Sequence, residues 1–141
     1  MDEKQNIRVL LIEDEPIIGI MFEEILIDAG FEVVGIAARL KFALDMIENC
    51  QFDAAIVDAN LAGESASPAA SALASRGVPF FMLSSYSAEQ IRDAFPGVLL
   101  VRKPCLAADL IQSVRNILTS FSQKALPTQN NDPPLDANSS D

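Results

Sequence analysis

The 141-residue sequence contains no histidine and no tryptophan, and only two cysteines, Cys50 and Cys105. Without histidine the chain cannot form a Ser-His-Asp triad, a Cys-His pair or a His-ligated zinc site, and it cannot carry a phosphohistidine itself. The two cysteines match neither a disulfide framework nor a CxxC metal motif, so we expect both to serve as small, partly buried apolar residues. Any site must therefore use carboxylates, hydroxyls, lysine or thiols.

Positive charge is also scarce, with 10 Lys and Arg against 20 Asp and Glu and a net charge of -10. This balance argues against a nucleic-acid partner, because neutralising phosphates requires clustered Lys and Arg. The first residues lack the apolar segment of a signal peptide, and no apolar run reaches the roughly 18 residues of a membrane span. We therefore expect neither export nor membrane insertion, and a reducing cytoplasm as the location.

Short apolar runs alternate with helical patterns along the chain. The first helical pattern places Ile18, Phe22, Ile25 and Ala29 three or four positions apart before Gly30. Apolar runs bounded by turn residues are typical of buried strands. The predicted strands are 7–12, 31–36, 54–57, 78–83 and 98–101. The predicted helices are one that begins at Pro16, 38–50, 67–75, a short one at 87–95, and a last one with the apolar stripe Leu106, Leu110, Val114, Ile117 and Phe121.

Five strands that alternate with helices predict an α/β fold, a doubly wound five-stranded parallel sheet covered on both faces. Since 50% of the residues are hydrophobic, the chain can bury a sizeable core. We expect one domain over 7–122, an N-terminal extension over 1–6, and no output domain. Residues 123–141 are acidic and rich in Pro, Asn and Ser, and we expect a disordered tail because they bury too little apolar surface.

Polar side chains lie at the carboxyl ends of four predicted strands. Glu13 and Asp14 follow the first strand, Asp58 the third, Ser84 the fourth and Lys103 the fifth. Ligands of open parallel sheets bind at this edge, so we expect one shared cleft. Three close carboxylates repel one another unless a cation lies between them, and carboxylate oxygens are typical Mg²⁺ ligands. The sequence therefore predicts a magnesium site.

A cation, a lysine and a hydroxyl together suit phosphoryl transfer. With Mg²⁺ on one phosphoryl oxygen, Lys103 on a second and the Ser84 hydroxyl on a third, the negative charge of the transferring group would be spread. Asp58 lies in the centre of this ring and is the candidate nucleophile for an aspartyl-phosphate.

Four motifs carry this pattern in order: the acidic pair after VLLI, the aspartate of AAIVDANL, the hydroxyl of PFFMLSS and the RKP that follows the fifth strand. Over about residues 6–122 the chain resembles the receiver domain of two-component response regulators. The resemblance implies the flavodoxin-like, CheY-like fold with strand order 2-1-3-4-5. It also implies Glu13 and Asp14 as the metal-binding pair, Asp58 as phosphoacceptor and metal ligand, the carbonyl of Asn60 as a further ligand, Ser84 as the switch hydroxyl, Lys103 as the invariant lysine, and a cis peptide before Pro104.

Several positions depart from the usual pattern of that family. The first acid is Glu13 instead of Asp, and the switch hydroxyl is Ser84 instead of Thr. Three positions before the lysine, Leu100 stands where the family usually has an aromatic residue. Four positions after the phosphoacceptor, Ala62 stands where the family commonly has proline. The segment between Ser84 and Lys103 is also shorter than usual. We expect a switch or partner face that includes Ser85, Tyr86 and Leu100.

The favoured hypothesis is a single-domain response regulator. Asp58 would accept a phosphoryl group from the histidine of a partner kinase or phosphotransfer protein, and the signal would leave by protein contact or phosphorelay, from a monomer or a phosphorylation-dependent dimer. We do not expect a turnover enzyme. The alternative is a phosphorylation-independent interaction module, motivated by Leu100 and Ala62. A small phosphohydrolase is less favoured because Asn60 occupies the place of the second acid that such enzymes use.

Overall fold

The computed structural model describes residues 6–85 and 97–125. A five-stranded parallel sheet lies at its centre, with the strand order β2-β1-β3-β6-β7. Its strands are β1 (Arg8–Ile12), β2 (Glu32–Ala37), β3 (Ala54–Asp58), β6 (Phe80–Ser84) and β7 (Leu99–Arg102). When these five are numbered along the chain, their order is the predicted 2-1-3-4-5, so the fold class is confirmed.

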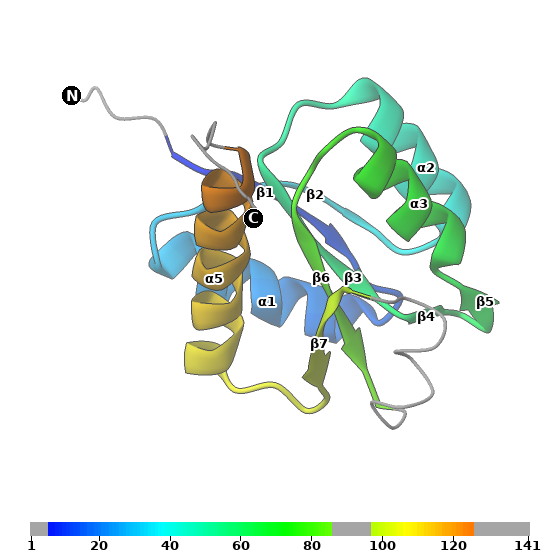
Figure 1. Ribbon diagram of the computed structural model, residues 1–141. Helices are drawn as coiled ribbons and strands as arrows, with labels where there is room; N and C mark the ends of the chain where they lie inside the picture. Colours follow the sequence, from blue (N-terminus) through cyan, green and yellow to red (C-terminus); the bar gives the residue numbers. More distant parts are fainter. Residues whose placement is uncertain (1–5, 86–96, 126–141) are drawn as a thin grey trace.

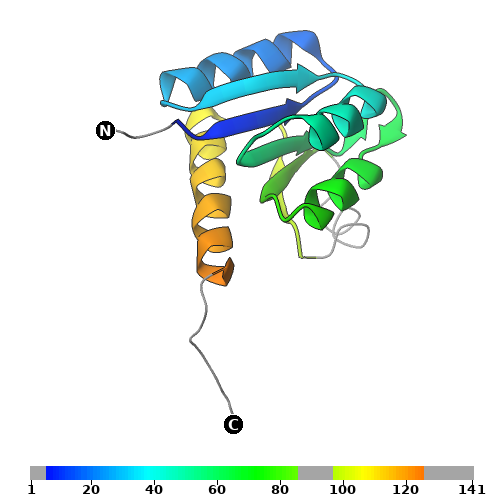
Figure 2. The same ribbon diagram turned by 90° about the horizontal axis from the view of Figure 1, so that it is seen from above.

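Helices cover both faces of the sheet (Figures 1 and 2). One face carries α1 (Pro16–Asp28) and α5 (Ala107–Ala125), and the other carries α2 (Leu40–Asn49) and α3 (Ser67–Ser75). Successive strand residues point to opposite faces, so β1 supplies both cores. Val9 and Leu11 pack with Phe22 of the α1 face, whereas Leu10 and Ile12 belong to the α2–α3 core.

Two features of the helices differ from the prediction. Leu106 was expected in the apolar stripe of the last helix, but its side chain is 72% exposed. It precedes α5, and its carbonyl accepts the N–H of Leu110, so it occupies the N-cap position, whose side chain does not follow the helical face. In α1 the fully buried residue is Leu26, while the predicted Ile18 and Ile25 are only half-buried.

Some of the predicted elements lie wholly or partly outside the described residues. Helix α5 runs to Ala125, three residues into the tail predicted from 123 onward. The rest of that tail, residues 126–141, the short helix predicted at 87–95 and the side chain of Phe121 lie outside the described residues. Cys50 and Cys105 are half-buried free thiols, as expected.

A short antiparallel hairpin was not predicted. It consists of β4 (Asn60–Leu61) and β5 (Glu64–Ser65) and comes directly after the third strand of the sheet. Ala62 and Gly63 form its two-residue turn, and both have positive φ angles, 53° and 89°. Two such residues match the right-handed twist of a tight hairpin, but alanine rarely adopts this conformation. The Ala-Gly pair was therefore a weak signal.

Candidate functional site

The strands bring the predicted polar residues to one edge of the sheet. Glu13 and Asp14 follow β1, Asp58 is the last residue of β3, Ser84 is the last residue of β6, and Lys103 follows β7. Because β3 lies between β1 and β6, Asp58 occupies the middle of this edge. Pro16 then begins α1, where its missing N–H removes no helical hydrogen bond. These residues reach the same edge because each strand is apolar along its length and ends at, or just before, its polar residue.

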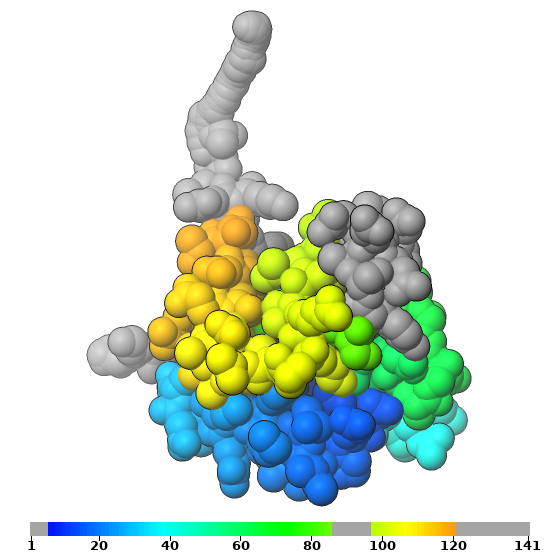
Figure 3. Space-filling view, turned by 90° about the horizontal axis from the view of Figure 1, so that it is seen from below, coloured from blue at the N-terminus to red at the C-terminus, as the bar shows by residue number. Residues whose placement is uncertain are grey.

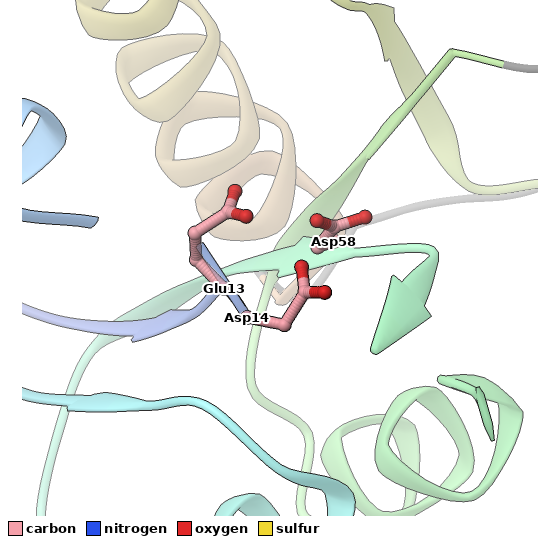
Figure 4. A group of neighbouring side chains, drawn as sticks. All are labelled: Glu13, Asp14 and Asp58. Atoms are coloured by element: carbon pink, nitrogen blue, oxygen red, sulfur yellow. The ribbon is translucent and has the colours of Figure 1, made fainter. Parts of the chain in front are cut away.

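Glu13, Asp14 and Asp58 form an acidic cluster (Figure 4). One carboxylate oxygen from each residue lies within 4.8 Å of the others. Glu13 and Asp58 are only 2% and 3% exposed, and Asp14 is half-buried. Oε1 of Glu13 is a buried oxygen with no hydrogen-bond donor among the described residues. Three converging carboxylates with such an oxygen fit a divalent cation that prefers oxygen ligands.

Lys103 is the cation that the chain itself brings to this cluster. Its Nζ donates a hydrogen bond of 2.9 Å to Oδ2 of Asp58 and lies 3.8 Å from Oε1 of Glu13. Burial alone would lower the pKa of Lys103, but the hydrogen bond and the charges of the two carboxylates outweigh it and raise the pKa above its ordinary value. The side chain therefore stays an ammonium ion, held beside Asp58.

Glu13 has a strongly shifted acidity. Burial, followed by hydrogen bonding and charge repulsion from Asp58, raises its pKa to about 8. The N–H of Glu15, 3.2 Å from Oε2, and the charge of Lys103 act in the opposite direction but do not cancel the shift. Without a further cation, Glu13 therefore holds a proton at neutral pH, and a divalent cation would displace that proton.

Asp58 is held at both carboxylate oxygens. Oδ1 accepts the backbone N–H of Asn60 at 3.1 Å, while Oδ2 accepts from Lys103. Oδ1 of Asn60 in turn accepts the N–H of Gly63 at 2.8 Å. The predicted metal ligand Asn60 is thus beside the cluster, in the first strand of the hairpin.

The hairpin is a part of the site that sequence reasoning missed. The backbone N–H of Ala62 donates to Oδ2 of Asp14 at 3.0 Å, so the turn is tied to the acidic cluster. Leu61 is completely buried and fixes the hairpin in the core. A proline at position 62 could form neither this hydrogen bond nor this turn, because it has no N–H and cannot adopt a positive φ angle. Ala62 allows both.

The switch residues have different surroundings. Ser84 is 5% exposed, and its carbonyl accepts the N–H of Lys103 at 3.0 Å, which links the end of β6 to the residue after β7. Ser85 is exposed, whereas Leu100 is half-buried and packs against the α2–α3 core. Tyr86 lies outside the described residues. The predicted cis peptide between Lys103 and Pro104 is present.

No family model matches the chain. The transcriptional regulatory protein PdtaR of Mycobacterium tuberculosis (strain CDC 1551 / Oshkosh) is 32% identical over 121 residues, which cover 82% of this chain and 58% of PdtaR. This chain thus spans less than two thirds of that curated relative. In the described part of the chain, no helix has the length and apolarity needed to cross a membrane.

Solved structures resemble the fold over most of the chain. A CheY-like response regulator receiver domain protein from Methanospirillum hungatei JF-1 has a TM-score of 0.75 and 26% identity, covering 86% of this chain and 100% of that one. A response regulator receiver protein from Sinorhizobium medicae WSM419 has a TM-score of 0.75 and 24% identity, with 83% and 98% coverage. Together with the strand order, these similarities show that the chain has the fold of CheY-like response regulator receiver domains.

Proposed function

We propose that the protein is a phosphoacceptor in a two-component pathway, in which Asp58 takes a phosphoryl group from a phosphohistidine of a partner kinase or phosphotransfer protein with Mg²⁺ in the acidic cluster. One observation carries the proposal. Asp58 is buried, receives the ammonium of Lys103 at 2.9 Å and faces two further carboxylates within 4.8 Å. A structural ion pair would not require the two extra acids.

The chemistry follows from these contacts. A carboxylate oxygen of Asp58 attacks phosphorus, the new O–P bond forms as the N–P bond of the phosphohistidine breaks, and the imidazole nitrogen keeps the electron pair. A divalent cation held by Glu13, Asp14 and Asp58 would neutralise charge on the phosphoryl oxygens. Lys103 already lies beside the acceptor, so it can pair with a phosphoryl oxygen once the carboxylate becomes an acyl phosphate.

The signal has a route out of the site. Ser84 supplies a hydroxyl close to Asp58, because its strand β6 pairs directly with β3. When the hydroxyl of Ser84 and the ammonium of Lys103 move to meet the phosphoryl group, they displace the ends of β6 and β7 together, since a backbone hydrogen bond joins these two residues. We propose that this displacement changes the surface of the fourth and fifth sheet strands that a downstream protein contacts.

The phosphodonor needs a surface beside the site, and we propose that α1 provides it. Ile17, Ile20 and Met21 are exposed on this helix, which begins two residues after Asp14. The segment that joins β7 to α5 lies next to α1 on the same face (Figure 3), and it exposes Leu106. A partner that presents its histidine to Asp58 would cover this apolar surface.

We further propose that the protein acts in the cytoplasm as a signalling protein, without turning over a substrate. Its output would be contact with a target or onward phosphorelay. Slow loss of its own phosphate fits this role, whereas turnover of small phosphoesters would instead support a phosphohydrolase.

The test is phosphorylation by a small donor. The wild-type chain with Mg²⁺ and acetyl phosphate is expected to gain one phosphoryl group by intact mass spectrometry, and Asp58→Asn none. Asp28→Asn removes an exposed carboxylate at the end of α1 and should leave the incorporation unchanged. Amide NMR spectra with beryllofluoride should shift at Ser84 and Lys103 in the wild type only. Full labelling of Asp58→Asn would refute the proposal, and a wild type inert to both donors would favour the interaction module.

A further inference from the structure

The outer side of α2 forms a surface that the proposed phosphorylation chemistry does not use. Its inner side lies against β2, where Met46 is so close to Gly35 that a side chain at Gly35 would collide with it. The outer side exposes Phe42 to 58%, an unusual fraction for an aromatic residue. An open hollow of about 720 Å³ lies along this side and is bordered by α2 and by Glu64 of the hairpin. In Figure 1, α2 lies at the edge of the molecule, beside α3.

The charges on this surface are arranged in two groups. Arg39 and Lys41 come before Phe42, whereas Asp45 and Glu48 come after it, and all four are exposed. Lys41, Asp45 and Glu48 are spaced by four and three residues, so they share one side of the helix. Cations near the N-terminus and anions near the C-terminus oppose the helix dipole, so the stability of α2 itself does not explain this order. Within the described residues, Arg39, Lys41 and Glu48 form no ion pair.

We propose that a second copy of this chain docks on this surface, with the two α2 helices antiparallel about a two-fold axis. The pairs Lys41 with Asp45 and Arg39 with Glu48 are both centred close to the level of Ala43 along the helix. One axis at that level therefore places the cations of each copy opposite the anions of the other. A two-fold interface must be self-complementary in this way.

The arrangement also accounts for the two features that the isolated chain leaves unexplained. Phe42, next to the centre of the charge pattern, would be buried against the other copy instead of facing water. The dipoles of the two antiparallel helices would point in opposite directions. The positively charged N-terminal end of each α2 would then face the acidic side chains near the C-terminal end of the other. The hollow extends to Glu64, so the second copy would also contact the hairpin whose turn is bonded to Asp14. The inference does not depend on phosphorylation of Asp58.

Exchange of charges tests the two-fold arrangement. The full chain is expected to self-associate in sedimentation equilibrium as its concentration rises to the millimolar range. In Arg39→Glu/Lys41→Glu, acids would face acids, and in Asp45→Lys/Glu48→Lys, cations would face cations, so each variant should associate about tenfold more weakly or worse. An equimolar mixture of the two variants should associate again, because every facing pair is then of opposite charge. Only a contact between the two charge groups predicts this recovery.

Single variants separate this surface from the other exposed apolar one. Phe42→Asp should abolish the association, while Ile20→Asp on α1 should leave it unchanged, and circular dichroism should show both folded because both positions are exposed. Dilution should shift amide NMR signals of α2 and β5 only. A wild type that stays monomeric at millimolar concentration, a mixture that fails to associate, or an association removed by Ile20→Asp but not by Phe42→Asp would each overturn the proposal.

Discussion

The acidic cluster and the outer side of α1 are neighbours with opposite properties. In the cluster, ionisable groups are buried, and Glu13 and Asp58 are almost inaccessible. On α1, apolar groups are exposed, with Ile17 accessible to 74%. Each arrangement is costly for folding alone, since buried charges lose hydration and exposed apolar groups order water. The difference fits the division of labour proposed above, in which the cluster would perform the chemistry and α1 would recognise the partner that brings the phosphoryl group.

The largest effect is expected from removing the cation of the cluster. Lys103→Ala should slow phosphorylation by acetyl phosphate at saturating Mg²⁺ by about a hundredfold or more, because the ammonium stabilises the charge that develops on the phosphoryl oxygens. The rate is measured by intact mass spectrometry over time. Lys41→Ala removes an exposed lysine on α2 and should leave the rate unchanged. A rate for Lys103→Ala close to that of the wild type would show that the lysine is only structural.

Metal binding should depend on pH through Glu13. Since its pKa is raised to about 8, binding Mg²⁺ requires loss of a proton below that pH. The apparent affinity should rise by about tenfold for each pH unit up to about 8 and then level off. Isothermal titration calorimetry from about pH 6 to about pH 9 measures this affinity. Glu13→Gln cannot release this proton and should bind with little pH dependence; the same slope in both proteins would contradict the assignment.

Recognition should be separable from chemistry. Ile20→Asp places a charge on the exposed side of α1, so transfer from a phosphorylated partner kinase or phosphotransfer protein should fall by about tenfold. Phosphorylation of the same variant by acetyl phosphate should keep the wild-type rate, because the small donor needs no docking surface. Ile27→Asp alters an equally exposed residue of α1 farther from the site and should disturb transfer less. Equal losses with both donors would place Ile20 in the chemistry and remove the distinction.

The smallest effect concerns the hairpin turn. Ala62→Gly should raise the free energy of unfolding by about 0.5 kcal/mol, since glycine relieves the positive φ angle while its N–H still reaches Asp14. Urea denaturation measures the change. Ala74→Gly at an exposed position of α3 is the matched control and should lower the stability by about 0.5–1 kcal/mol. A destabilised Ala62→Gly would show that the alanine is not strained.

Elements with a strong apolar pattern could be predicted from the sequence. The helix over 67–75 has the predicted bounds, and the strand that leads to Asp58 extends one residue past its predicted end. Leu106 was misplaced because its spacing fits a helical stripe, although the chain enters α5 only after it. The hairpin escaped prediction because its strands have two residues each, too few for any periodicity.

The residue types of the candidate site follow from the sequence alone. The absence of histidine and the polar residues after four apolar strands already restricted the chemistry to carboxylates, a hydroxyl and a lysine. Apolar periodicity is a local property, so it reports where a strand ends without the tertiary structure. The parallel sheet order then requires these ends to share one edge.

Only the tertiary structure decided how the site residues act on one another. Lys103 and Asp58 are 45 positions apart in the sequence, and their 2.9 Å contact depends on the register of β6 with its neighbours and on the path of the chain after β7. The raised pKa of Glu13 arises from burial, which no local pattern specifies. The bond from Ala62 to Asp14 likewise needs a turn from one segment to meet a loop from another. Distances between side chains are set by packing, because the sequence orders residues along the chain but not across it.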